Sequence, residues 1–261
     1  ALIMRSRIVW HLNDTKMHPI ILFIFRVLSR YASGIVYASE KTELYYKPLI
    51  KEVRKSTVIS SPVSNRFFKQ QKNADKKLKS EINVITVANI SPIKGFELLI
   101  QVARLCEPSV PVHFFVVGTV FETQNAYYKK ITDLIDKFEL SNITFLGSSD
   151  NVDQILSDMD IYFCSSVSES SPIAVWEAMA KGLPIVSTDV GDVKKYVEAY
   201  GAGFIRNAAS SITRIFANLA ERRDELEIKG IASRKCASDN FSQQKCTEAH
   251  IDFLQGISEE E

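Results

Sequence analysis

The chain has 261 residues, 46% of them hydrophobic and 24% charged, a composition that is typical of a globular protein and excludes an intrinsically disordered one. Its 32 Lys and Arg residues and 31 Asp and Glu residues give a formal net charge of +1, so no strong overall field favours nucleic acid as a partner. The four cysteines form no C-x-x-C pair and do not cluster with the histidines, which argues against a zinc site or a disulfide framework and favours a cytoplasmic setting.

Residues 1–70 are predicted to form a small unit with three strands. Its elements fall roughly at residues 7–12, 19–31, 33–39 and 57–60. Three strands are too few for a whole Rossmann-like domain, so we expect this unit to be the C-terminal part of an N-terminal domain that lacks its start. The polar stretch 68–77 contains no strand formers and places a domain boundary near residue 70.

The most apolar run of the chain spans residues 20–25 and is interrupted by Arg26. A helix that crosses a bilayer needs about 20 apolar residues, so this run is not a transmembrane segment. It indicates a helix that is either buried or turned toward a membrane surface, with Arg26 and Arg30 near the lipid headgroups in the second case.

Residues 71–240 show strands that alternate with helical patterns. Nearly continuous hydrophobic runs predict strands at 82–87, 112–117, 143–146, 160–164 and 184–187. Segments such as 96–105 between them have apolar residues at helical spacing. The alternation predicts a doubly wound parallel sheet, and hence a Rossmann-like domain of the α/β class.

The C-terminal part is predicted to be helical. An amphipathic helical stretch near 208–238 is followed by a break at 239–242 and by a helix to about residue 255. We expect residues 241–261 to form a C-terminal helix that packs back on the N-terminal domain and ends in a frayed acidic tail.

Ligands of open parallel α/β sheets bind beyond the carboxyl ends of the strands, so the residues that follow each strand are candidates for the site. The turn at 87–95 places Lys94 at the start of a helix, where an ammonium group and free backbone amides can hold phosphate. Gly118 directly follows a strand, where a glycine permits close approach of a ligand. Each feature alone also fits a bland interpretation, a solvated lysine and a simple turn.

The segment 165–186 carries the strongest signal. Pro172 suits the first position of a helix with Ser171 as its N-cap, and Gly182 ends that helix before the next strand. The helix start is therefore predicted to receive an anion, with Glu169 before it and Glu177 about 7–8 Å along the helix axis. The two carboxylates would bracket an extended ligand and accept hydrogen bonds from its hydroxyl groups.

These residues resemble glycosyltransferase family 4 (group 1), the retaining glycosyltransferases of GT-B fold, whose hallmark is two glutamates separated by seven residues. Glu169 and Glu177 have that spacing, and the sequence AMAKGLPIV that follows is similar to the family's usual continuation. Similar blocks lie at 87–95, 116–118, 145–147 and 187–191, so the resemblance covers about residues 80–205 in the family's order.

The resemblance implies roles for individual residues. Glu169 would lie near the transferred sugar, Lys94 would bind the diphosphate and Glu177 the nucleotide ribose. Further donor-binding positions are Asn89, Ser91, Gly118, Gly147, Ser170, Ser171, Pro172 and Ile173. Since proline has no N–H, Pro172 can contribute no hydrogen bond from its backbone.

Residues 8–68 resemble the end of the family's N-terminal domain. The segment 9–15 is similar to its strand-end histidine segment, so His11 is a candidate catalytic residue at the cleft, although it could simply end a strand.

Two positions depart from the family pattern. Asn89 and Ser91 stand where many members have a basic residue, and Asp192 follows Gly191 where two consecutive glycines are common.

The resemblance implies transfer of a sugar from a nucleoside diphosphate sugar to a hydroxyl group of a glycan or lipid-linked acceptor, with retention and without a metal or other cofactor. Synthesis of a bacterial surface polysaccharide or glycolipid, in the cytoplasm or at the inner face of the membrane, is the setting we expect. Two alternatives stay open, a nucleotide-sugar-binding chain without catalysis of its own and a GT-B-fold nucleotide-sugar epimerase. A dinucleotide-dependent oxidoreductase is disfavoured because no G-x-G-x-x-G motif is present.

Overall fold

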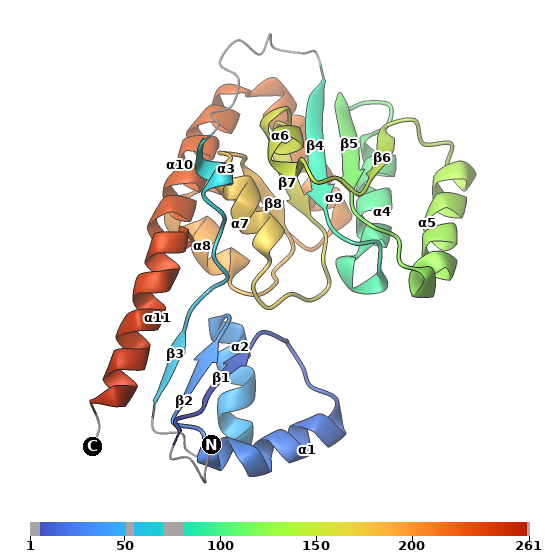
Figure 1. Cartoon of the computed structure of the whole chain (residues 1–261). Coiled ribbons are helices and arrows are strands. Elements are labelled where there is room, and N and C mark those ends of the chain that lie inside the picture. Colours follow the sequence, from blue (N-terminus) through green and yellow to red (C-terminus); the bar gives the residue numbers. More distant parts are fainter. Residues whose placement is uncertain (1–5, 51–54, 70–80, 260–261) are drawn as a thin grey trace.

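The computed structural model describes residues 6–50, 55–69 and 81–259 and contains two parallel sheets (Figure 1). A three-stranded sheet has the order β1-β2-β3, and a six-stranded sheet has the order β6-β5-β4-β7-β8-β9. The strands are β1 (Val9–Leu12), β2 (Gly34–Tyr37), β3 (Ser56–Val58), β4 (Ile82–Val87), β5 (Val112–Val117), β6 (Ile143–Gly147), β7 (Ile161–Cys164), β8 (Ile185–Ser187) and β9 (Gly203–Ile205). The α/β class and the parallel sheet predicted from the sequence are confirmed.

The six-stranded sheet is covered on both faces. Successive side chains of a strand point to opposite faces, and here they enter two separate cores: Ile85 and Tyr162 belong to one, Val84 and Phe163 to the other. The first face is covered by α3 (Arg66–Lys69), α6 (Val152–Ser157), α7 (Ile173–Ala180), α8 (Val193–Tyr200) and α10 (Asp224–Asn240). The second face is covered by α4 (Phe96–Cys106), α5 (Asn125–Lys137) and α9 (Ala209–Glu221). Burial on both faces explains why the strands are almost continuously hydrophobic.

Two details of the predicted elements were wrong. The stretch 208–238 is not one helix, because α9 ends at Glu221 and α10 begins at Asp224. The break expected at 239–242 is shorter, since α10 runs to Asn240, and the Ser242 hydroxyl accepts a hydrogen bond from the Lys245 amide as the N-cap of α11 (Gln243–Ser258). The five strands predicted between residues 82 and 187 agree with the structure to within a residue at each end, those predicted in residues 1–70 differ from it by up to two residues, and β9 was not predicted.

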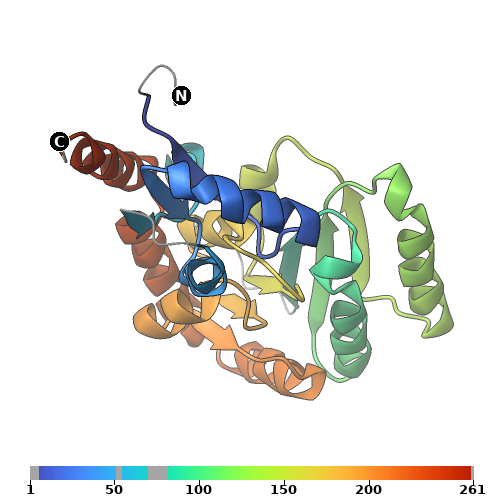
Figure 2. The ribbon, with the colours of Figure 1, turned by 90° about the horizontal axis from the view of Figure 1, so that it is seen from below.

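The smaller sheet packs against α1 (Pro19–Leu28) and α2 (Glu40–Tyr46). In α1 only Phe25 is buried and Leu22 is partly buried, while Phe23 is 68% exposed and most other large apolar side chains of the helix are also exposed. Figure 1 shows α1 at the end of the molecule opposite the six-stranded sheet, and Figure 2, seen from below, shows α1 lying across the molecule. Within the described ranges, every helix is too short or too polar to cross a lipid bilayer.

The two sheets are connected by α3 and by α11. Phe67 of α3 is fully buried in one core of the six-stranded unit, although it precedes the boundary placed near residue 70; the stretch 70–80 lies outside the described residues. Helix α11 leaves the larger unit and runs along the smaller sheet (Figure 1). There Cys246 packs with Val36 and Ile59. The chain thus returns from the larger unit to the smaller one, and the two are held side by side.

Candidate functional site

A cavity of about 460 Å³ lies at the carboxyl ends of β4 and β7. From β4 the chain first adds β5 and β6 on one side and then crosses to β7 on the other. Loops that leave neighbouring strands at such a reversal diverge, and the crevice between them is where open parallel sheets bind ligands. The fold therefore forms a cavity at the edge of the sheet where the sequence predicted a ligand site.

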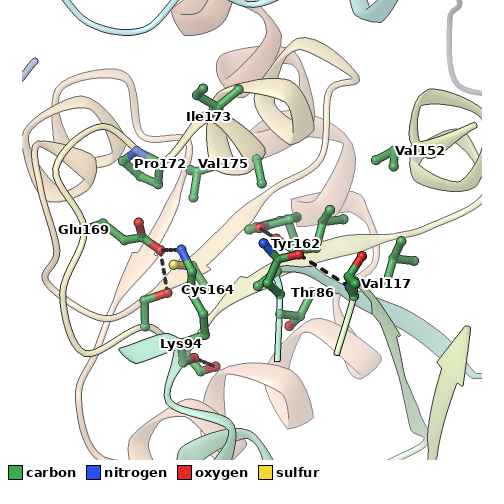
Figure 3. Close-up of a pocket in the computed structure, with 18 of the residues that line it drawn as sticks. Thr86, Lys94, Val117, Val152, Tyr162, Cys164, Glu169, Pro172, Ile173 and Val175 are labelled. Atoms are coloured by element: carbon green, nitrogen blue, oxygen red, sulfur yellow. Dashed lines mark hydrogen bonds and ion pairs between the residues drawn. The ribbon is translucent and has the colours of Figure 1, made fainter. Parts of the chain in front are cut away.

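Lys94 and Glu169 meet in this cavity (Figure 3). Lys94 Nζ lies 2.5 Å from Glu169 Oε1, which also accepts a hydrogen bond of 2.8 Å from Ser166 Oγ. Both charged side chains are mostly buried, with 26% and 16% of their surfaces exposed. A cation and an anion are thus held together at one wall of the cavity, and either is available to a ligand that separates them.

Backbone contacts fix the position of Lys94. It ends the short helix η3 (Pro92–Lys94), and the next residue, Gly95, has a left-handed conformation with φ of 65°. A Cβ at Gly95 would lie only 2.1 Å from the Ser165 carbonyl oxygen, so a glycine is required for both conformation and space. Val167 N also donates to the Ile93 carbonyl at 2.8 Å, which joins the Lys94 turn to the loop that carries Glu169.

The start of α7 differs from the prediction. The helix begins at Ile173, with Pro172 in the N-cap position, so the interpretation of Ser171 as a capping residue was wrong. The Ser171 hydroxyl instead accepts hydrogen bonds from Trp176 Nε1 at 3.1 Å and from Ser61 N at 3.0 Å. The first amides of a helix have no acceptor within the helix, so those of Ile173 and Ala174, two residues that line the cavity, are placed for an anion.

Glu177 lies one turn further along α7 and is only half-buried. Burial raises the pKa of its carboxyl group to about 7, and the Arg66 charge opposes this while Asp153 adds to it. Glu177 is not among the residues that line the 460 Å³ cavity. The structure does not bring the two carboxylates into one cavity, and the bracketing of a ligand by Glu169 and Glu177 stays a prediction.

The predicted site residues fall into two groups. Those that line the cavity are Asn89, Lys94, Gly118, Glu169, Ser171, Pro172 and Ile173. Those that do not are His11, Ser91, Gly147, Ser170 and Glu177. Ser91 precedes η3, and the Gly147 carbonyl accepts a hydrogen bond of 2.9 Å from the Gly118 amide, so Gly147 supports the cavity wall from outside.

His11 lies away from the cavity. Its ring stacks on the His250 ring of α11, with a centroid distance of 5.3 Å. Burial, and secondarily the neighbouring His250, lower the pKa of His11. Because its ring stacks on a residue of α11 and His11 does not line the cavity, we do not retain it among the residues proposed for catalysis.

The sequence analysis missed several lining residues. Thr119 and Ser148 lie within two residues of the ends of β5 and β6 and could have been found by the rule that identified Gly118. Thr86, Tyr162 and Cys164 lie inside strands, where the hydrophobic pattern gives no sign that they border a cavity. Tyr162 is nearly inaccessible and its hydroxyl donates to the Val87 carbonyl at 3.2 Å, so it closes the floor of the cavity (Figure 3).

A second cavity of about 220 Å³ lies on the other side of Glu169, between the two units. The smaller unit contributes Thr15, Lys16, Lys41, Thr42 and Tyr45, and the larger unit contributes Val167, Ser168, Glu169, Asp189, Val190 and Gly191. Glu169 lines both cavities. The carboxylate therefore stands at the boundary between a site inside the larger unit and a site that both units form.

Comparison with known proteins supports the resemblance. Residues 67–225 match the family model described as Glycosyl transferases group 1. WcaL of Escherichia coli (strain K12), which carries the name of a colanic acid biosynthesis glycosyltransferase, is 26% identical over 189 residues, 67% of this chain and 45% of WcaL. N-acetyl-alpha-D-glucosaminyl L-malate synthase of Bacillus anthracis is 26% identical over 144 residues, 53% of this chain and 36% of that protein. The chain thus spans less than half the length of both relatives.

Solved structures share the fold. Anabaena Alr3699/HepE in complex with UDP superposes with a TM-score of 0.88 at 21% identity, covering 98% of this chain and 74% of that one. WaaG, a glycosyltransferase involved in lipopolysaccharide biosynthesis, gives a TM-score of 0.76 at 15% identity, covering 94% and 74%. At these identities the likeness concerns the architecture, and it confirms the predicted GT-B-type arrangement.

Proposed function

The chain belongs to the Glycosyl transferases group 1 family, and on that premise we propose that it binds a nucleoside diphosphate sugar in the 460 Å³ cavity and transfers the sugar to a hydroxyl acceptor with retention. The observation that carries the proposal is the Lys94–Glu169 pair at the point where the strand order reverses. The structural relative Alr3699/HepE was solved with UDP and with UDP-glucose, which supports a uridine nucleotide as the donor.

In this proposal the protein stabilises the leaving diphosphate. Negative charge grows on the phosphate as the bond to the sugar breaks, and fixed positive groups lower the energy of that state. Lys94 Nζ and the first amides of α7 supply those groups, so we propose transfer without a metal ion. To bind, the diphosphate must draw Lys94 away from Glu169, which leaves the carboxylate beside the sugar.

The nucleoside is proposed to extend toward Glu177. A carboxylate accepts hydrogen bonds from two ribose hydroxyls well only when it is ionised, and the pKa near 7 makes this depend on pH. Arg66 nearby favours the ionised form. Asn89 and Gly118, on the opposite wall, are proposed to border the donor without contributing charge.

The acceptor is proposed to enter through the 220 Å³ cavity, because this cavity reaches Glu169 from the other side. Its hydroxyl-bearing and charged lining suits a glycan. The name of WcaL, which refers to colanic acid biosynthesis, supports a role in polysaccharide biosynthesis, for which we propose a cytoplasmic setting. The exposed apolar side chains of α1, with Arg26 and Arg30 beside them, support contact with a membrane that carries a lipid-linked acceptor.

Calorimetry with UDP, GDP and ADP, followed by a donor-hydrolysis assay, tests the proposal. We expect one nucleoside diphosphate to bind and its sugar to be released. Lys94→Ala should weaken that binding by about 10- to 100-fold, since a hydrogen bond to a charged group contributes about 1.5–3 kcal/mol, and should slow turnover by about 10²–10³. Failure of all three nucleotides to bind would refute the donor site, and binding without turnover would favour a nucleotide-sugar-binding chain.

A further inference from the structure

Asp192 joins the two units through a buried carboxylate. It lies at the start of α8 in the larger unit and is only 4% exposed. Asp192 Oδ2 accepts a hydrogen bond of 2.7 Å from Glu40 N, and Asp192 Oδ1 accepts one of 3.4 Å from Lys41 N. Both amides belong to the first turn of α2 in the smaller unit. A carboxylate is therefore used inside the protein to hold a backbone turn of the other unit.

The same turn of α2 contacts the Glu169 loop. Thr42 Oγ1 lies 2.8 Å from Ser170 Oγ, and the Ser39 and Thr42 hydroxyl oxygens are also 2.8 Å apart. All three hydroxyl-bearing residues are buried. Ser170 is the residue after Glu169, so the hydrogen bonds run from Asp192 through the first turn of α2 to the loop that carries the carboxylate of the site.

A second contact closes this arrangement. Gly191 has φ of 48°, and a Cβ at this position would lie 2.3 Å from the Ser170 carbonyl oxygen. The loop that carries Asp192 and the loop that carries Glu169 thus touch through their backbones. Thr188 Oγ1 also donates to the Ser166 carbonyl at 2.6 Å. The Glu169 loop is held on one side by 188–192 and on the other by α2.

Two exposed ion pairs surround these buried contacts. Lys41 pairs with Asp189 at 2.5 Å, and Lys195 pairs with Glu40 at 2.6 Å. Ion pairs as accessible as these contribute little, about 0–1 kcal/mol. The hydrogen bonds to Asp192 are expected to contribute more, because they involve a charged group that is only 4% exposed and are partly shielded from water. The Asp192 carboxylate is therefore the contact on which the docking of α2 depends.

We propose that Asp192 is a positioning residue for glycosyl transfer: it fixes α2 against the larger unit and so holds the Glu169 loop in place. The role in transfer rests on the proposed function, which places Glu169 beside the sugar. The holding of the Glu169 loop by Asp192 and α2 does not depend on that function.

The test compares three variants of the whole chain. Asp192→Ala removes both acceptors, Asp192→Asn keeps one acceptor oxygen, and Glu40→Ala removes an exposed side chain at the same interface while leaving the Glu40 amide. Hydrogen–deuterium exchange is measured for peptides that cover 39–46 and 165–171. For Asp192→Ala we expect exchange to rise at least tenfold in both peptides, with Asp192→Asn between it and the wild type and Glu40→Ala equal to the wild type.

Kinetics separates positioning from a general loss of structure. In Asp192→Ala the turnover number should fall at least tenfold while UDP affinity changes less than threefold, because the 460 Å³ cavity lies inside the larger unit. Unchanged exchange in 165–171, or turnover equal to that of Glu40→Ala, would overturn the proposal. If the wild-type chain binds no nucleoside diphosphate, the proposed function fails, while the exchange of 165–171 still decides whether Asp192 holds the loop.

Discussion

At the scale of single residues, burial and neighbouring charges make the carboxyl groups of Glu169 and Glu177 differ. Glu169 and Glu177 are both glutamates near the same helix, yet Glu169 is paired with Lys94, whereas burial raises the pKa of Glu177 to about 7. The spacing of the two residues was visible in the sequence. The difference between them was not, because it depends on Lys94, Arg66 and Asp153, which approach from other parts of the chain.

The raised pKa of Glu177 predicts how stability changes with pH. A carboxyl whose pKa is higher in the folded state than its ordinary value of 4.5 contributes stability below pH 4.5, and this contribution is lost as the pH rises through about 7. We expect Glu177→Gln, which stays neutral, to be more stable than the wild type at pH 8 but not at pH 4. Urea unfolding at both values measures this, and an equal difference at the two pH values would contradict it.

At the scale of elements, the strands and the edge of the sheet that holds the 460 Å³ cavity could be predicted because they depend on local patterns. Continuous apolar runs identified β4, β5 and β7, and the rule for parallel sheets placed Lys94 and Glu169 at one edge. The hydrogen bonds that the Ser171 hydroxyl accepts could not be predicted, since the donors are the Ser61 amide, 110 positions away, and the indole of Trp176. β9 was missed because it begins with Gly203 and offers only two apolar residues in a row, whereas the equally short β8 belongs to a longer apolar run.

The turn from η3 into α4 offers a test of backbone packing. Gly95 and Gly201 have nearly equal φ, 65° and 68°, but a Cβ at Gly95 would meet the Ser165 carbonyl oxygen at 2.1 Å, whereas nothing lies within 4 Å of one at Gly201. We expect Gly201→Ala to lower the free energy of unfolding by about 1 kcal/mol and Gly95→Ala by at least about 2 kcal/mol.

The two glycine variants also differ in their expected effect on the site. Gly95→Ala should weaken UDP binding as well, because the clash moves the Lys94 turn away from the Glu169 loop, while Gly201→Ala should leave binding unchanged. Chemical denaturation and calorimetry check both effects. Equal losses of stability in the two variants would show that conformation alone, and not the contact with Ser165, determines the need for glycine at residue 95.

At the scale of the whole molecule, the two units meet through contacts that are distant in sequence. Thr42 meets Ser170, Glu40 meets Asp192, and α11 returns along the smaller sheet. The sequence predicted two units from the polar stretch 68–77, and it predicted a separate C-terminal helix from the break at 239–242. It did not identify the second cavity, whose lining comes from both units and includes the Glu169 carboxylate.

The ion pair between Lys94 and Glu169 has a consequence for affinity. The carboxylate already neutralises the ammonium group, so it competes with the phosphate of an incoming nucleotide for the same cation. Part of the binding energy is spent on displacing it. Glu169→Gln should therefore bind UDP more tightly than the wild type, by about tenfold if the lost competition is worth about 1.4 kcal/mol, while its turnover falls. Calorimetry and a turnover assay on this one variant check the prediction. Tighter UDP binding with slower turnover would show that Glu169 lowers the affinity for the nucleotide while it supports transfer, whereas weaker binding would mean that Glu169 assists nucleotide binding.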